Sequence, residues 1–183
     1  MKQKFYKEIE IPQGVEIKLE DSLLVVKGKE GENERELNLN NISLEIKKEK
    51  IVIGNDKTTK NEKKRINTLV AHIQNMIKGV QEKFEYKLKI CSSHFPMNVS
   101  SKGDVVEIKN FLGEKISRET KIPKGAQMQI QGQNITITST DKEIAGQAAA
   151  NLEAITKIKK KDSRIFQDGI YIVNKAGKEI WNS

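Results

Sequence analysis

The sequence predicts an α+β fold in which one module occurs twice, followed by a basic C-terminal extension. Three observations lead to this prediction. Apolar residues alternate with polar ones in many short runs, the pattern of these runs repeats once, and each copy ends with an amphipathic stretch. Each module is therefore expected to pack small antiparallel β-sheets with one α-helix. The expected boundaries are 1–81 for the first module, 82–158 for the second and 159–183 for the extension.

The repeat is seen in the spacing of apolar residues. Residues 15–28 and 97–110 share the same order: an alternating run, a polar turn and a second alternating run. Matched residues differ by 82 positions at first and by 84 later, because the intervening loop differs by two residues. The matched pairs are Leu24 with Val106, Val26 with Ile108, Leu44 with Met128, Ile46 with Ile130, Ile51 with Ile135 and Ile53 with Ile137.

The alternating runs are expected to be β-strands with one buried face. Val15, Ile17 and Leu19 would point to one side of a sheet, and the charged residues between them to the other, because side chains alternate along a strand. Short polar turns separate the runs, and such turns join antiparallel neighbours in hairpins. The predicted turns are residues 20–22, 48–50, 102–104 and 132–134.

The first helix is predicted to begin near Thr59. Thr59 and Glu62 have the spacing of a capping box, in which each side chain accepts a hydrogen bond from the backbone of the other residue. Gly79 is expected just beyond the end of the helix. The residues that follow the helical period, and so should face the core, are Ile66, Leu69, Val70, Ile73 and Ile77.

The second helix is predicted from the same signals, with Thr140 and Glu143 as the capping box. Its apolar stripe contains Ile144, Ala148, Leu152 and Ile155, and much of it is slim because of Gly146, Ala148, Ala149 and Ala150. Small residues allow either a tight contact with a sheet or the close approach of an RNA backbone. The tight contact is preferred, because tertiary packing explains most helical faces.

Composition indicates a soluble, cytoplasmic protein. The chain is 36% hydrophobic and 32% charged, which suits a globular protein with modest cores better than a disordered chain. No apolar run approaches the roughly 20 residues needed to span a membrane, and the first residues lack the apolar region of a secretory signal. Cys91 is the only cysteine, which excludes an intramolecular disulfide and fits a reducing compartment.

Catalytic chemistry finds little support in the sequence. Cys91 and His94 are the only local pair with nucleophilic potential, but neighbouring positions at a strand end seldom aim both groups correctly. One cysteine and two histidines cannot complete a zinc site of nitrogen and sulfur ligands, and no glycine-rich phosphate loop is present. We therefore expect no enzyme activity, cofactor, metal or small-molecule substrate, and we expect His72 to be a packed or edge residue of the first helix.

Positive charge gathers at the C-terminus. Residues 157–183 hold seven basic and three acidic residues, a net charge of +4 out of +8 for the chain. Basic side chains neutralise phosphates, and aromatic side chains stack on unpaired bases. Apolar residues within 164–173 argue against a frayed tail. The candidate residues are Lys157, Lys159, Lys160, Lys161, Arg164, Phe166 and Tyr171, with Phe166 expected to anchor the extension to the second module and Tyr171 either to anchor it or to stack.

A second basic cluster lies at the start of the first helix. Cations there oppose the helix dipole, which suggests an anionic surface as their partner. A solvated lysine face is the slightly preferred interpretation, so this cluster is a secondary candidate. Its members are Lys57, Lys60, Lys63, Lys64 and Arg65.

Three sequence blocks give the chain its resemblance to a known family. They are SHFPM at 93–97 with NFLGEK at 110–115, DKE at 141–143 with GQAAAN at 146–151, and DSRIFQDGIY at 162–171; the opening IPQGV at 11–15 also fits. Together they resemble the large-subunit ribosomal protein L-six family in its archaeal and eukaryotic form. The third block differs from the proline- and lysine-rich bacterial version, which indicates an archaeal source.

The resemblance implies a non-enzymatic constituent of the large ribosomal subunit with a duplicated fold. It implies binding to 23S rRNA near the sarcin–ricin loop and the stalk base, where translation factors dock, next to other ribosomal proteins and away from membranes. It adds Gln167 and Gly169 to the RNA-binding candidates. Two alternatives remain open: an RNA-binding regulatory protein that acts outside the ribosome, and a cysteine-dependent enzyme.

Overall fold

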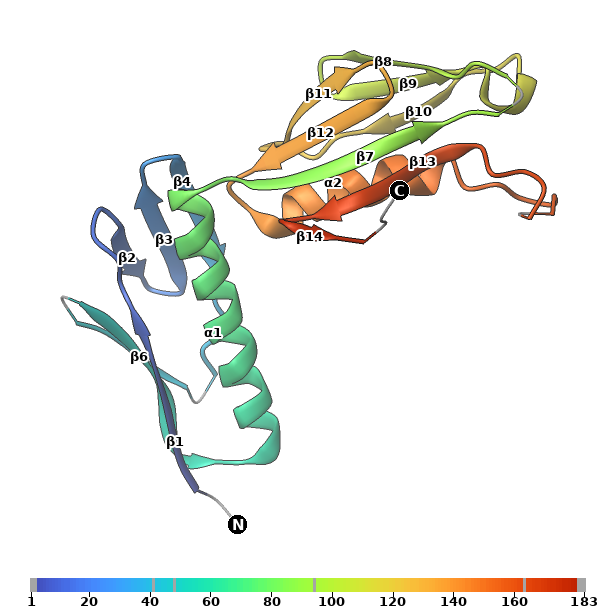
Figure 1. The fold of residues 1–183 in the computed structure, drawn as a ribbon. Helices are drawn as coiled ribbons and strands as arrows, with labels where there is room; N and C mark the ends of the chain where they lie inside the picture. The colour runs from blue at the N-terminus through green and yellow to red at the C-terminus, as the bar shows by residue number, and fades with distance from the viewer. Residues whose placement is uncertain (1–2, 41, 48, 94, 163, 181–183) are drawn as a thin grey trace. The chain divides into compact units, whose positions relative to one another are not determined.

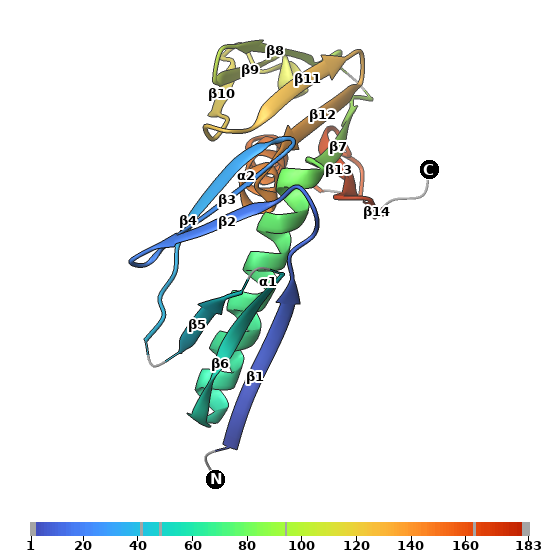
Figure 2. The same ribbon diagram turned by 90° about the vertical axis from the view of Figure 1, so that its left-hand side faces the viewer.

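A computed structural model describes residues 3–40, 42–47, 49–93, 95–162 and 164–180. The chain divides into two compact units, Met1–Lys83 and Phe84–Ser183. Each unit has its own cluster of buried apolar side chains. Antiparallel sheets and two α-helices make up the described chain (Figures 1 and 2), which confirms the predicted α+β class with a duplicated module.

The first unit contains two three-stranded antiparallel sheets and one helix. One sheet has the order β1-β6-β5 and the other the order β2-β3-β4. Figure 2 shows β1, β6 and β5 side by side along the helix. The strands are β1 (Gln3–Glu10), β2 (Glu16–Glu20), β3 (Leu23–Gly28), β4 (Gly31–Glu36), β5 (Ser43–Ile46) and β6 (Lys50–Thr58).

Helix α1 (Lys60–Gln81) begins with the predicted capping box. The Thr59 hydroxyl accepts a hydrogen bond from the Glu62 backbone nitrogen at 3.4 Å, and the Glu62 carboxylate accepts one from the Thr59 nitrogen at 2.6 Å. The predicted stop at Gly79 is wrong, because the helix continues to Gln81. Gly79 is buried on the packed face, where tertiary contact outweighs its weak helix propensity. All five residues of the predicted stripe are buried.

The second unit repeats this plan and extends it. A three-stranded sheet has the order β10-β9-β8, and a five-stranded sheet has the order β11-β12-β7-β13-β14. The last two strands have no counterpart among the described residues of the first unit, where β1 is an edge strand. The elements are β7 (Phe84–Cys91), β8 (Asn98–Lys102), β9 (Val105–Lys109), the 3₁₀ helix η1 (Phe111–Gly113), β10 (Arg118–Lys121), β11 (Gln127–Gln131), β12 (Asn134–Ser139), β13 (Gly169–Lys175) and β14 (Lys178–Glu179).

The predicted repeat is confirmed at the level of individual strands. Leu24 and Val26 of β3 are fully buried, as are Val106 and Ile108 of β9, so each central strand contributes the same face to its core. The later pairs fall on β5 and β11, and on β6 and β12. In both units these strands form hairpins with antiparallel pairing. The predicted turn at 48–50 includes Lys48, which lies outside the described residues.

Helix α2 (Lys142–Ile155) starts one residue later than predicted. Its N-cap is Asp141 rather than Thr140, and the Asp141 carboxylate accepts a hydrogen bond from the Glu143 nitrogen at 2.7 Å. Asp is preferred over Thr at the N-cap, which explains the difference from the prediction. Ala145, Ala148 and Ala149 are fully buried against the sheets, whereas Ala150 is exposed. The slim face of the helix is therefore a tight helix–sheet contact.

Candidate nucleic-acid interface

The predicted basic residues lie in an irregular segment, 157–168, that connects α2 to β13 (Figure 1). A hydrogen bond closes the base of this segment. The Thr156 hydroxyl accepts a hydrogen bond from the Ile170 nitrogen at 2.9 Å and donates to the Leu152 carbonyl at 3.3 Å. Thr156 is buried, so these bonds are shielded from water. The end of the helix and the start of the strand are held together, and the segment between them projects as a loop.

The lysines of this segment are turned to solvent. Lys157, Lys159, Lys160 and Lys161 are all exposed. Lys160 has a φ of 58°, in the left-handed region that non-glycine residues rarely adopt. A left-handed residue reverses the local chain direction, so the lysines do not continue the line of the helix. They form an exposed basic turn at the end of the second unit.

Phe166 links this turn to the body of the unit. Its ring is half-buried and lines a surface pocket of about 490 Å³ together with Ala150 and Ala154 of α2. The Lys161 ammonium lies 4.7 Å from the centre of the ring, within range of a cation–π contact. The ring therefore supports the position of Lys161.

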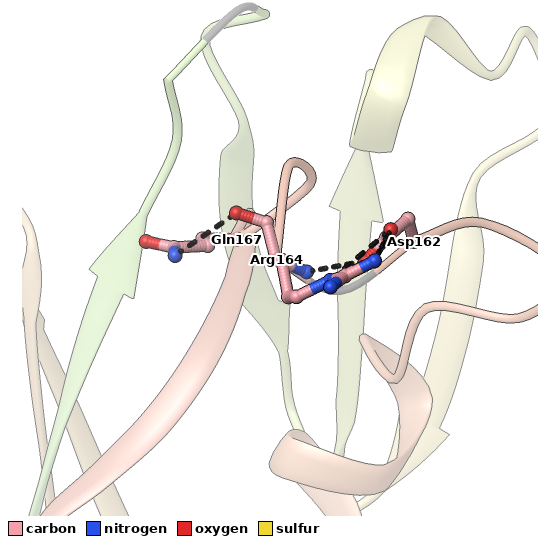
Figure 3. A network of polar contacts seen from close by, with 3 residues as sticks. All are labelled: Asp162, Arg164 and Gln167. Atoms are coloured by element: carbon pink, nitrogen blue, oxygen red, sulfur yellow. Dashed lines mark hydrogen bonds and ion pairs between the residues drawn. The ribbon is translucent and has the colours of Figure 1, made fainter.

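Arg164 is paired within the segment (Figure 3). Its guanidinium donates to both carboxylate oxygens of Asp162, with Nη2 at 2.8 Å from Oδ2 and Nε at 3.1 Å from Oδ1. Its backbone nitrogen also donates to Asp162 at 2.9 Å. Side-chain and then backbone hydrogen bonds from Arg164 lower the pKa of the Asp162 carboxyl. The guanidinium is oriented by this pairing while its side chain remains 88% exposed.

Gln167, Gly169 and Tyr171 form the junction with β13. The Tyr171 hydroxyl donates to the Gln167 carbonyl at 3.0 Å, and the Gln167 amide donates to the Arg164 carbonyl at 3.4 Å. A Cβ atom on Gly169 would lie 3.2 Å from the Tyr171 ring and hydroxyl, which is tighter than ordinary packing. Burial raises the pKa of Tyr171, and nearby Cys91, Asp168 and Glu153 act in the same direction. Tyr171 is thus a packed residue with an engaged hydroxyl.

Asp168 is a structural residue of this site that the sequence did not single out. Its side chain is 3% exposed, and one carboxylate oxygen accepts hydrogen bonds from the Ser93 nitrogen at 2.5 Å and hydroxyl at 2.6 Å. This contact attaches the end of the basic segment to the end of β7. In the sequence, the only sign of this role is an acidic residue directly before the first glycine of a β-strand. That pattern does not identify Ser93 as the partner of Asp168.

Of the candidate pair Cys91 and His94, the structure describes only Cys91. Cys91 is half-buried at the end of β7, and His94 lies outside the described residues. Within the described chain, no group of three or more His, Cys, Asp or Glu side chains is arranged to hold a metal ion. The helices among the described residues are also too short or too polar to cross a membrane.

The secondary cluster at the start of α1 is spread over exposed positions. Lys57, Lys60, Lys64 and Arg65 are exposed, and the Lys63 ammonium lies 4.8 Å from the centre of the Phe5 ring. These side chains lie around the start of α1, where the negative charge of Glu62 already interacts favourably with the helix dipole.

Comparison with known proteins gives a consistent result. The family model described as Ribosomal protein L6 matches residues 11–83 and 95–169. A large ribosomal subunit protein uL6 from Methanococcus vannielii is 48% identical over 173 residues, covering 94% of this chain and 95% of the relative. A protein of the same name from Methanobrevibacter smithii is 45% identical over 168 residues, covering 92% of this chain and 94% of the relative.

Proposed function

The chain belongs to the ribosomal protein L6 family of structural, non-enzymatic proteins of the large ribosomal subunit, and we propose that its second unit binds 23S rRNA through residues 157–171. Membership places it in cytoplasmic ribosomes. The proposed RNA-binding residues are Lys157, Lys159, Lys160, Lys161, Arg164, Phe166, Gln167, Gly169 and Tyr171.

The observation that carries this proposal is the pairing of the acids in the basic segment. Asp162 is held by Arg164, and Asp168 is buried against Ser93. Neither carboxylate is directed at the exposed lysines, so the segment presents an excess of positive charge to solvent. Such a surface attracts the phosphates of RNA and releases their counterions on binding.

The residues divide into two roles. The lysines and Arg164 contact phosphates, because they are exposed and cationic. Gln167, Gly169 and Tyr171 hold the segment in shape through their contacts with each other and with the Arg164 carbonyl. Phe166 supports it from the pocket that it lines together with residues of α2. This arrangement favours recognition of RNA backbone and shape over recognition of base sequence.

The location that we propose is the region of the sarcin–ricin loop and the stalk base, near the docking site of translation factors. The proposal rests on the likeness of residues 162–171 to the archaeal and eukaryotic form of the family. The neighbouring ribosomal proteins there would be further partners. Chemical probing of the rRNA with and without this protein tests it: protection should be confined to that region, and protection elsewhere would refute the location.

Sedimentation of a cell lysate at low and high salt separates this function from its alternative. An integral ribosomal protein remains with large subunits at high salt, because many phosphate contacts act together. A regulatory protein that acts outside the ribosome would be recovered in the light fractions under both conditions. That second result would contradict the proposal.

A further inference from the structure

A second exposed segment lies at the same end of the second unit as residues 157–168 (Figure 1). It is the connection between β9 and β10, residues 110–117, and it has an unusual backbone. Asn110 and Leu112 have φ values of 60° and 52°, and Gly113 has a φ of 78°. For a leucine this conformation costs on the order of 1–3 kcal/mol, so the surrounding structure must enforce it. Phe111, which lies between the two strained residues, is 1% exposed and anchors the turn.

Arg118 fixes this loop to the last turn of α2. Its guanidinium donates to both oxygens of the Glu114 carboxylate, at 2.8 Å and 2.6 Å, and to the Ile155 carbonyl at 2.6 Å. It also lies 4.3 Å from the centre of the Phe111 ring. Ile155 is the last residue of the helix that leads into the basic segment. The loop and the basic segment therefore share one rigid support.

The loop also lies within electrostatic range of the basic segment. Hydrogen bonds from Arg118 lower the pKa of the Glu114 carboxyl, and the charge of Lys161 acts in the same direction. The two side chains that follow Glu114 are directed to solvent: Lys115 is exposed and Ile116 is 83% exposed. A largely exposed isoleucine beside a lysine on a strained, tightly supported turn is suited to contact with another molecule.

We propose that Lys115 and Ile116 form a second contact with the same 23S rRNA, Lys115 pairing with a phosphate and Ile116 packing on a sugar or base face. The inference rests on the proposed function and adds binding residues to it. RNA is favoured over a protein because the only acids in residues 110–117 and 157–164, Glu114 and Asp162, are each paired with an arginine. The lysines of both segments are therefore not neutralised by these two acids.

The test is filter binding to a full-length 23S rRNA transcript over a range of salt concentrations. Lys115→Gln removes one phosphate contact, so the slope of log K against log salt should become shallower by roughly 0.7–0.9. Ile116→Ser removes an apolar contact, so affinity should fall several-fold at every salt concentration while the slope stays unchanged. Both side chains are exposed, and unchanged thermal unfolding would verify that the variants fold.

Lys124→Gln is the matched control. Lys124 is exposed in the same unit. It precedes Gly125, where an added Cβ atom would contact the side chain of Ile144, near the start of α2. It therefore lies at the opposite end of the helix from Ile155 and Arg118. This variant should bind like the wild type.

The outcomes separate the inference from the proposed function. If Lys159, Lys160 and Lys161 are replaced by Gln together and binding does not change, the proposed interface itself fails. If that triple variant weakens binding but Lys115→Gln and Ile116→Ser both match the wild type, only the second contact is overturned. Reduced incorporation into large subunits with unchanged affinity for the transcript would assign the loop to a protein neighbour and would also overturn it.

Discussion

Asp168 and Ser93 are 75 residues apart in the sequence, and one carboxylate oxygen of Asp168 accepts hydrogen bonds from both the backbone nitrogen and the hydroxyl of Ser93. The contact joins the residue before β13 to the end of β7. Together with the hydrogen bond from the Ile170 nitrogen to the Thr156 hydroxyl, this contact fixes the positions of the two ends of the basic segment. The shape of the candidate interface therefore depends in part on the buried residues Thr156, Asp168 and Ile170.

Replacing this carboxylate should destabilise the protein. Asp168→Ala removes two hydrogen bonds that a buried carboxylate accepts from Ser93, which should lower the free energy of unfolding by about 1–3 kcal/mol. Urea denaturation measures the loss. Asp104→Ala changes the same residue type at an exposed turn of the same unit and should have little effect. Equal stability of the two variants would show that the Asp168–Ser93 contact contributes nothing.

Neutralising the basic turn should weaken RNA binding and make the affinity less dependent on salt concentration. When Lys159, Lys160 and Lys161 are replaced by Gln together, up to three phosphate contacts are lost, and the slope against log salt should become shallower by roughly 2–3. The control replaces Lys7, Lys18 and Lys29, which are exposed lysines of the first unit, and makes the same charge change. A slope that stays constant in the first variant would remove the turn from the interface.

The pairing of Asp162 with Arg164 should depend on pH in a defined direction. Hydrogen bonds from Arg164 lower the pKa of Asp162, so the pair is complete above the ordinary pKa and is lost as the pH falls through the lowered value. Carboxyl ¹³C NMR can follow the titration. Arg164→Gln should raise the Asp162 midpoint towards the ordinary range. An unaltered midpoint would mean that the two groups do not interact in solution.

The slim face of α2 should not accept a larger side chain. Ala148→Leu forces extra atoms into a fully buried contact with the sheets, which costs about 1–3 kcal/mol. Ala150→Leu adds the same atoms to an exposed position two residues later and should leave stability nearly unchanged. Thermal unfolding of the pair measures the difference. Similar stabilities would indicate that the helix–sheet contact is loose.

The strongest local patterns predicted their elements well. The alternation in residues 15–28 and 97–110 and the stripe from Ile66 to Ile77 reproduce the strands and the helix of the structure. Thr59 was identified as the N-cap because the capping-box pattern of Thr59 and Glu62 lies within four residues. The end of α1 was placed too early because Gly79 is buried on the packed face of a helix that continues to Gln81. The cap of α2 was placed one residue early because Thr140 and Asp141 can both cap a helix.

The sequence by itself determined the duplicated α+β plan and the position of the basic residues, because alternation, helical period and charge are properties of short stretches. Only the tertiary structure decided that β13 pairs with β7, that Asp168 meets Ser93, and that Arg118 joins the loop at 110–117 to the end of α2. These contacts bring together residues far apart in the chain. Their partners are selected by the packing of whole strands and helices, which no local pattern records.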